Sequence, residues 1–437
     1  MNWCMFAKDG DRSSLDHRAV WTSKFSVPMG TPVRESLDIW PPFPVAIQYH
    51  LNKIFTFFDK ANLLAALAHH GRIRQVYLSL TSRRIEEVAA VMQQPFPELT
   101  HLDFQWEGEG PPALPSGFLG GSAPCLQHLH LDCIRFPEML MFLSSTSNLV
   151  NLHLHNIPQE GYVSPEAMVA GLAGLPMLQS LFIGFLSDTS LHSQISPPPV
   201  TRTLLPALTS CEFRGASEYL EEFVSRIDSP RLNQIYLRYT YQLIDFQVAQ
   251  LFQFLDRSED PKLTPIWSAK VQFARPWVSF DLYPQHVGHL VFSQPLERGP
   301  VCAFINCQGI ERQISRIAQV FSQPSAILSG VVYLELSLSQ ANADRHGNEW
   351  LRLLRQFSAI RTLHISGMCT RELALVLDDV TAETVAEVLP VLELICIDGQ
   401  PVSCIEKFLA ARRFSDQPVT IVETEAELYE SFKPYVI

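Results

Sequence analysis

The sequence predicts an α/β fold in which short parallel strands alternate with helices. One phrase occurs three times, as LTHLDFQ at 99–105, LQHLHLD at 126–132 and LVNLHLH at 149–155. Each copy follows the pattern LxxLxL, and the copies recur at roughly the 20–29-residue period of leucine-rich repeats. We therefore expect a leucine-rich-repeat solenoid, a horseshoe with a parallel β-sheet on its concave face and helices on its convex face.

Alternation with a period of two explains why this phrase must be stacked. In the second copy, Leu129 and Leu131 point to one face of the strand, and His128 and His130 point to the other. One strand cannot bury its apolar face alone, so further repeats stack at about 4.8 Å per strand and share a core. The chain then returns across the outside, usually as a helix. Charged helix residues such as Glu221 are expected on a solvated convex face.

The chain before the first regular repeat divides into two segments. Residues 1–30 show no sustained periodicity, which predicts a poorly ordered N-terminal extension. Residues 31–72 are predicted to form an N-terminal cap. Within this cap, alternation over 45–49 indicates a first strand, and the spacing of apolar residues over 58–71 indicates a helix.

Residues 73–415 form the predicted repeat domain, because strand and helix patterns alternate regularly there. Ten strand phrases begin at Ile73, Leu99, Leu126, Leu149, Leu178, Leu208, Leu232, Val331, Ile360 and Leu392. Helices are predicted at 85–92, 165–175, 217–227, 246–255, 311–321, 349–357 and 405–414. Crossover connections of this kind join parallel strands with a right-handed turn.

Two stretches interrupt the regular pattern, and a third closes it. Residues 187–203 are polar and rich in proline, which predicts a loop. Residues from about 261 to 310 lack a clean phrase and contain several prolines, which predicts irregular repeats with longer strands or a hairpin. Residues 416–437 are expected to form a C-terminal cap, with a strand at 418–422 and an acidic helix at 423–432.

Composition argues against several classes of protein. The net charge is −12, and no run of basic residues is longer than pairs such as Arg412-Arg413, which we interpret as solvated, so no nucleic-acid partner is expected. No apolar run approaches the ~20 residues that a membrane span needs. The nine cysteines form no CxxC pair, which indicates reduced thiols. With no signal-peptide pattern at the start, the predicted location is cytoplasmic or nuclear.

The sequence has no GxxxxGK[ST] phosphate loop, no HExxH motif and no GxSxG motif. The prediction is that the protein is not an enzyme and has neither catalytic residues nor a cofactor.

Four longer phrases carry a family resemblance. They are TPVRESLDIWPPFPV at 31–45, LPSGFLGGSAPCLQHLHLD at 114–132, GYVSPEAMVAGLAGLPMLQSL at 161–181 and LPALTSCEFRGASEYLEEFVSRIDSPRLN at 205–233. Over roughly residues 31 to 415 the chain resembles a family of F-box and leucine-rich-repeat proteins from mushroom-forming fungi. The resemblance implies an F-box helical bundle before residue 31, docked on the Skp1-type adaptor of a cullin ubiquitin ligase, and repeats that hold the substrate.

The chain departs from this family at its start. Its first 30 residues are too short for an F-box bundle and lack an LP-rich opening helix, so we expect the F-box to be missing or truncated. Two functions stay open. One is the protein-binding substrate receptor of a ubiquitin ligase, and the other is a stand-alone repeat scaffold or truncated copy with no ligase role.

Histidines gather on the predicted concave side of three neighbouring strands. Two imidazoles and a carboxylate on adjacent strands, ~5 Å apart, could share a zinc ion. The alternative is a solvated polar wall or a pH-sensitive contact patch. We adopt this second interpretation and predict no metal, because a metal site also needs converging geometry.

Aromatic and basic residues extend this surface onto the next strands, and tyrosine and arginine often anchor protein interfaces. The predicted partner-binding residues on the concave face are His101, Asp103, His128, His130, His153, His155, Phe182, Arg214, Tyr236 and Arg238.

Overall fold

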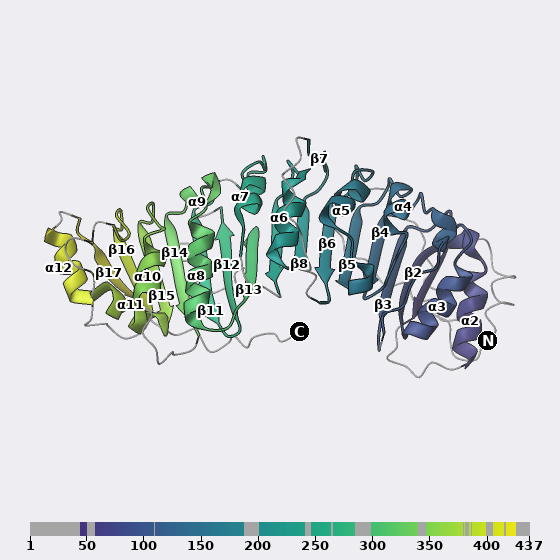
Figure 1. Ribbon diagram of the computed structural model, residues 1–437, viewed down its shortest axis with the longest axis horizontal. Coiled ribbons are helices and arrows are strands. Elements are labelled where there is room, and N and C mark those ends of the chain that lie inside the picture. The colour runs from purple at the N-terminus through teal and green to yellow at the C-terminus, as the bar shows by residue number, and fades with distance from the viewer. Residues whose placement is uncertain are drawn as a thin grey trace, which may run out of the picture.

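A computed structural model gives the structure of the protein (Figure 1). It describes residues 44–49, 57–108, 110–187, 201–240, 246–263, 265–284, 299–339, 347–378, 380, 384–385, 387–398, 405–414 and 417–424. The predictions for residues 1–30, for most of the 187–203 loop and for most of the acidic helix at 423–432 lie outside these residues.

The fold is mixed α/β and is built on one large sheet. Fifteen strands lie in the order β1-β2-β3-β4-β5-β6-β8-β10-β13-β12-β11-β14-β15-β16-β17. Their bounds are Val45–Tyr49 (β1), Ile73–Leu80 (β2), His101–Trp106 (β3), His128–Asp132 (β4), Asn151–Ile157 (β5), Ser180–Phe185 (β6), Ser210–Gly215 (β8), Gln234–Tyr239 (β10), Ser268–Ala274 (β11), Trp277–Tyr283 (β12), Val301–Asn306 (β13), Tyr333–Leu338 (β14), Thr362–Gly367 (β15), Leu394–Asp398 (β16) and Thr420–Thr424 (β17). Pairs are parallel except those that β12 makes with β11 and β13.

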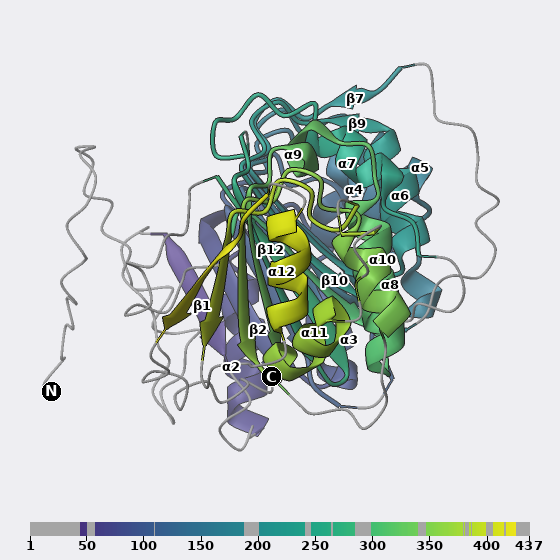
Figure 2. The same cartoon turned by 90° about the vertical axis from the view of Figure 1, so that its left-hand side faces the viewer.

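Helices follow most strands, and those labelled α5 to α8 and α10 lie together on one side of the sheet in Figure 2. The helices are Phe57–Leu67 (α2), Ser82–Val91 (α3), Met139–Ser144 (α4), Pro165–Leu172 (α5), Ser217–Ser225 (α6), Ala249–Leu255 (α7), Ile310–Phe321 (α8), Ala326–Ser329 (α9), Gly347–Leu354 (α10), Cys369–Asp378 (α11) and Glu406–Phe414 (α12). No described helix is both long enough and apolar enough to cross a lipid bilayer.

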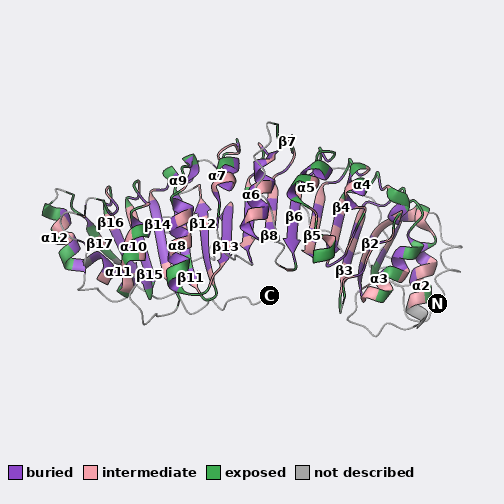
Figure 3. Ribbon diagram, viewed as in Figure 1, coloured by how far each residue is buried: buried purple, intermediate pink, exposed green. Residues whose placement is uncertain are grey.

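Every predicted strand phrase contains a strand. In nine of the ten phrases the strand begins two residues after the opening Leu, Val or Ile, and in the phrase at Ile73 it begins at once. The opening leucine is buried in the turn before the strand, as Leu126 shows with no exposed surface. The next two apolar residues, Leu129 and Leu131, then enter the core between sheet and helices. Figure 3 shows this burial running through the strands of the sheet.

The seven helices predicted within the repeat domain and the helix predicted at 58–71 are also present, and α5 begins with a side-chain cap. In α5, the backbone N–H of Ala167 donates to Oγ of Ser164 at 3.3 Å, and Pro165 occupies the first turn. Helices α4, α9 and α11 were not predicted. Helices α4 and α9 are only six and four residues long. Patterns that short give little periodic signal.

A hairpin is present in the stretch predicted to be irregular. Strands β11 and β12 pair antiparallel and are joined at Arg275-Pro276. Strand β13 then returns beside β10, and β14 is placed outside β11. These strands follow one another along the chain as β11, β12 and β13. Across the sheet from β10 to β14, their order is β13, β12 and β11.

Two charged residues that were predicted to be solvated are buried. Glu221 on α6 is 8% exposed, and its carboxylate accepts the backbone N–H groups of Gln250 at 2.7 Å and Leu251 at 2.9 Å. It therefore caps the next helix, α7. Arg412 on α12 is fully buried and donates to the carbonyl oxygens of Leu389 and Leu392. Both were misplaced because each satisfies backbone groups of a neighbouring repeat.

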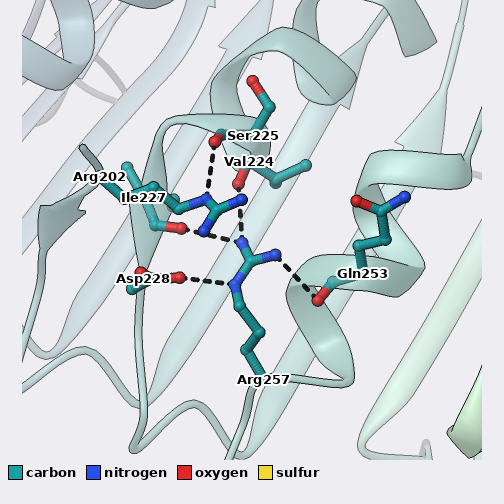
Figure 4. A network of polar contacts seen from close by, with 7 residues as sticks. All are labelled: Arg202, Val224, Ser225, Ile227, Asp228, Gln253 and Arg257. Atoms are coloured by element: carbon teal, nitrogen blue, oxygen red, sulfur yellow. Dashed lines mark hydrogen bonds and ion pairs between the residues drawn. The ribbon is translucent and has the colours of Figure 1, made fainter. Parts of the chain in front are cut away.

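A second small sheet stands at one edge of the structure, where β7 (Thr203–Leu204) pairs with β9 (Ile227–Asp228). Arg257 binds this edge to α6 and α7 (Figure 4). Its Nε lies 2.6 Å from a carboxylate oxygen of Asp228, and its Nη groups donate to the carbonyls of Gln253, Val224 and Ile227. This guanidinium is thus matched to a carboxylate and to backbone oxygens.

Candidate functional site

The candidate site lies on the face of the sheet opposite the core, which we call the open face. Strand register places Asp103, His130, His153 and Phe182 in one row across β3, β4, β5 and β6. The row continues through Glu212 on β8 and Tyr236 on β10. Because the strands are parallel and their core residues fix the register, side chains of this row are neighbours.

A stacked histidine pair lies beside the start of this row. The rings of His101 and His128 are 4.0 Å apart between centroids and within 16° of parallel. Thr100 Oγ1 donates to the carbonyl of Arg74 and lies 2.9 Å from Nδ1 of His101. Asn151 Nδ2 can only donate, and it lies 2.6 Å from Nδ1 of His128. In this orientation of the amide, Nδ1 of His128 accepts the hydrogen bond.

Three further histidines form an edge-to-face group. The ring of His130 lies 4.8 Å from that of His155 and 6.2 Å from that of His153. Nδ1 of His130 lies 3.1 Å from Oδ1 of Asp103, and Nε2 of His153 lies 3.1 Å from Oγ of Ser180. The group is half-buried, so its rings present both edges and faces to a binding partner.

Burial keeps most of these histidines uncharged near pH 7. The pKa of His101 is lowered to about 4, first by desolvation and then by His128 and Arg74. The pKa of His155 is also lowered to about 4, first by desolvation and then by unfavourable electrostatic interaction with His130, His153 and Arg214, while Asp103 acts in the opposite direction. Desolvation also lowers the pKa values of His128 and His153. These histidines therefore make their part of the open face polar and aromatic while adding little positive charge.

A metal site would need nitrogen and oxygen atoms that converge on one point. In the described part of the chain, no group of three or more His, Cys, Asp and Glu residues could hold a metal ion. The stacked pair meets face to face and the other rings meet edge to face. This packing turns the ring nitrogens toward separate partners, which disfavours the zinc interpretation.

Phe182 joins the histidine group to the next part of the open face. Its ring stacks on that of His155, and only 8% of the residue is exposed. The ring lies over Gly184, where an added Cβ would come within 2.6 Å of Cε1 of Phe182. Gly184 is in register with Arg214, so the missing side chain lets the ring approach that arginine.

Arg214 and Arg238 face each other across β8 and β10. Nη1 of Arg214 donates to Oδ1 of Asn156 at 3.4 Å, and Nη2 of Arg238 donates to Oη of Tyr236 at 3.2 Å. The ring of Tyr236 lies 5.6 Å from that of Phe304 on β13. Two guanidinium groups with aromatic neighbours therefore stand on the open face.

All ten predicted partner-binding residues lie on the open face. The structure brings five of them, Asp103, His130, His153, His155 and Phe182, into one contact group. His101 and His128 stack as a pair beside it, and Arg214, Tyr236 and Arg238 form a third group. Sequence reasoning missed Asn156 and Gly184. Asn156 has a left-handed φ of 49° at the register shift within β5, and Gly184 contributes only by lacking a side chain, so neither follows from alternation.

The open face has a second polar region over β11 to β16 that was not predicted. Lys270 Nζ lies 2.8 Å from Glu335 Oε1. His364 is fully buried, with Nε2 at 2.8 Å from Asp398 and Nδ1 at 3.0 Å from Oη of Tyr333. For Tyr333, Glu335, His364 and Asp398 the signal was present, because they alternate with core residues in or directly after the phrases that begin at Val331, Ile360 and Leu392. Lys270 lies in the stretch without a clean phrase.

No family model matches this chain. A search of curated proteins also finds no match.

Proposed function

We propose that this chain is a leucine-rich-repeat solenoid that recognises a protein partner on the open face of its sheet. The observation that carries the proposal is the unbroken row of side chains from Asp103 to Tyr236, displayed by parallel strands in fixed register. The row contains carboxylate, imidazole and aromatic groups at neighbouring positions, and Arg214 and Arg238 form the next register pair on β8 and β10. Tyrosine, tryptophan and arginine are the residue types most enriched among binding hot spots.

Rigid presentation supports this proposal physically. The row residues sit on strands whose alternate side chains, such as Leu129, Leu152 and Leu181, are at most 1% exposed in the core. A side chain on such a strand loses little backbone freedom when a partner binds, which lowers the cost of association. Neutral histidines add hydrogen-bonding edges without the cost of desolvating a full charge.

We further propose that the partner is a substrate delivered to an F-box type ubiquitin ligase in the cytoplasm or nucleus. This part is supported by the four phrases shared with the fungal F-box and leucine-rich-repeat family. Co-purification with the Skp1-type adaptor is its test. If the adaptor is absent while a partner still binds the open face, the chain is a stand-alone repeat scaffold.

Photo-crosslinking tests the binding face directly. A benzophenone amino acid replaces His153 on the open face or, as a control, Arg83 on α3, whose side chain is 91% exposed. After illumination in cell extract, the proposal expects the same protein adducts from repeated preparations at position 153 and none of them at position 83. Adducts confined to position 83 would show that the partner uses the helical side.

A further inference from the structure

Charge is sparse and nearly balanced on the part of the open face that carries the candidate site. Its six neighbouring strands, β3, β4, β5, β6, β8 and β10, contain three acids and, apart from histidine, two bases. The acids are Asp103, Asp132 and Glu212, and the bases are Arg214 and Arg238. These residues together have a net charge of −1, so this part of the face is close to neutral although the whole chain has a net charge of −12.

Three of these charged groups contact polar groups of the fold. Oδ1 of Asp103 lies 3.1 Å from Nδ1 of His130. Nδ2 of Asn156 donates to Oδ1 of Asp132 at 2.7 Å, and Oδ1 of the same amide accepts from Arg214 at 3.4 Å. A binding partner therefore meets acids and an arginine that already have neighbours of their own.

Glu212 and Arg238 complete this mixed pattern. Glu212 lies in register between Phe182 and Tyr236, and Arg214 is the next open-face residue along the same strand. Nη2 of Arg238 donates to Oη of Tyr236 at 3.2 Å. Charges of opposite sign thus stand at neighbouring positions, and this part of the face presents no broad field of one sign.

The histidines add hydrogen-bonding atoms more than charge. Desolvation lowers the pKa of four of the five, to about 4 for His101 and His155. A neutral imidazole has one N–H donor and one accepting nitrogen, both at the ring edge. One face of each ring in the two stacks is covered, because His101 lies on His128 and His155 lies on Phe182. Ring edges suit amide and hydroxyl groups, whereas the sugar rings of a glycan pack on free aromatic faces.

We propose that the open face from β3 to β10 binds an extended, uncharged polar segment of the protein partner. The inference rests on the proposed function and specifies the chemistry of what that site binds. Backbone amides and the side chains of Asn, Gln, Ser and Tyr supply donors and acceptors that match neutral imidazoles. A segment rich in one charge would meet a group of its own sign beside every group of the opposite sign, and like charges at close range repel.

The accessible width of the face sets the length of this segment. Six strands at about 4.8 Å span roughly 24 Å, which about seven or eight extended residues cross. The far part of the open face is closed to such a segment, since Glu335 on β14 and His364 on β15 are at most 3% exposed.

A displayed library of random twelve-residue peptides, selected on the full chain, tests this inference. We expect the enriched peptides to contain less than about half as many charged residues as the input library. Because salt screens only interactions between charges, the affinity of an enriched synthetic peptide should change less than about twofold between 50 and 500 mM NaCl. Enrichment of acidic or basic peptides, or about a tenfold loss of affinity at the higher salt concentration, would overturn the inference.

Substitutions at Ser210 test the sign of the charge. Ser210 lies on the open face of β8, in register with Ser180 and Gln234. Both Ser210→Lys and Ser210→Glu should weaken the enriched peptide about threefold or more, because each adds a charge that meets no opposite charge in the peptide. A basic segment would bind Ser210→Glu more tightly than wild type, and an acidic segment would bind Ser210→Lys more tightly. Either result would contradict an uncharged segment.

A matched control separates the open face from general charge. Ser144→Lys and Ser144→Glu make the same changes at an exposed residue of α4, and the affinity for the peptide should stay within about twofold of wild type. Melting temperatures verify that all four variants are folded. Displacement of the peptide by dextran oligosaccharides would assign the site to a glycan, and failure to enrich any peptide would also overturn the inference. In both cases, protein crosslinks at position 153 would still support the proposed function.

Discussion

The ring of His155 lies flat against the ring of Phe182, with centroids 3.7 Å apart and planes within 6°. The stack exists because Gly184, two residues along β6 from Phe182, leaves room for the phenylalanine ring. A backbone position without a side chain thus shapes the centre of the open face.

Gly184→Ala should disturb this stack. The new Cβ would come within 2.6 Å of Phe182, closer than real Cβ contacts, so the ring must move away from His155. We expect a loss of roughly 1–3 kcal/mol in the free energy of unfolding, typical of overpacking, measured by urea denaturation. Gly174→Ala is the control, since its Cβ would meet only Ser144 at 3.9 Å. Equal losses in both variants would rule out a specific role for Gly184.

Neighbouring residues of β5 should respond oppositely to the same substitution. Leu152 is fully buried, so Leu152→Asp places a charge in the shared core and should cost more than about 4 kcal/mol or prevent folding. His153 points to the open face, and His153→Asp should stay within about 1 kcal/mol of wild type. The yield of folded protein and the melting temperature report both. Similar losses would mean that the strand register is wrong.

The histidines predict acid sensitivity. The pKa values of His101 and His155 fall from 6.5 to about 4 on folding, so the unfolded chain binds more protons between these pH values. Their contribution to stability is complete above pH 6.5 and is lost as the pH falls toward 4. The double variant His101→Phe with His155→Phe keeps an aromatic ring at both stacked positions but removes the two groups that titrate. Urea denaturation across this pH range should therefore show a shallower fall for the double variant, and an unchanged slope would contradict the assignment.

Glu221 predicts the opposite pH dependence. Burial raises its pKa from 4.5 to about 7 despite the two N–H groups that it accepts, so the folded chain binds more protons between these values. Its contribution is complete below pH 4.5 and declines as the pH rises through about 7. Glu221→Gln removes this titration while keeping an acceptor for α7. Relative to wild type, the variant should gain up to about 3 kcal/mol as the pH rises from 4.5 to 7, measured by urea denaturation. A constant difference across that range would refute the shift.

Sequence periodicity was sufficient to place most of the site. Alternation assigns Leu129 and Leu131 to the core and His128 and His130 to the open face, and the structure agrees. The register across strands then brings Asp103 beside His130. These placements follow from short-range rules, because the side-chain period of a strand is two whatever the rest of the chain does.

Other features depend on partners far along the chain and could not be predicted. Glu221 meets Gln250 and Leu251 from the next repeat, 29 and 30 residues away. A helical glutamate is usually solvated, and only the packing of α6 against α7 reverses that expectation. Asn156 likewise acquires its role through Arg214, 58 residues later. Local patterns carry no information on such contacts.

The reversed placement of β11, β12 and β13 also limits how the sheet can change length. Elsewhere, strands that follow one another in the chain are also neighbours in the sheet, apart from the short strands β7 and β9, so a duplicated or deleted strand–helix unit adds or removes one sheet position. Between β10 and β14 the three strands are interlocked, since β13 borders β10 and β11 borders β14. Removing any one of them would leave its neighbours without a pairing edge. Evolutionary growth and designed shortening of this protein are therefore confined to the blocks on either side, and residues 268–306 must be inherited as a unit.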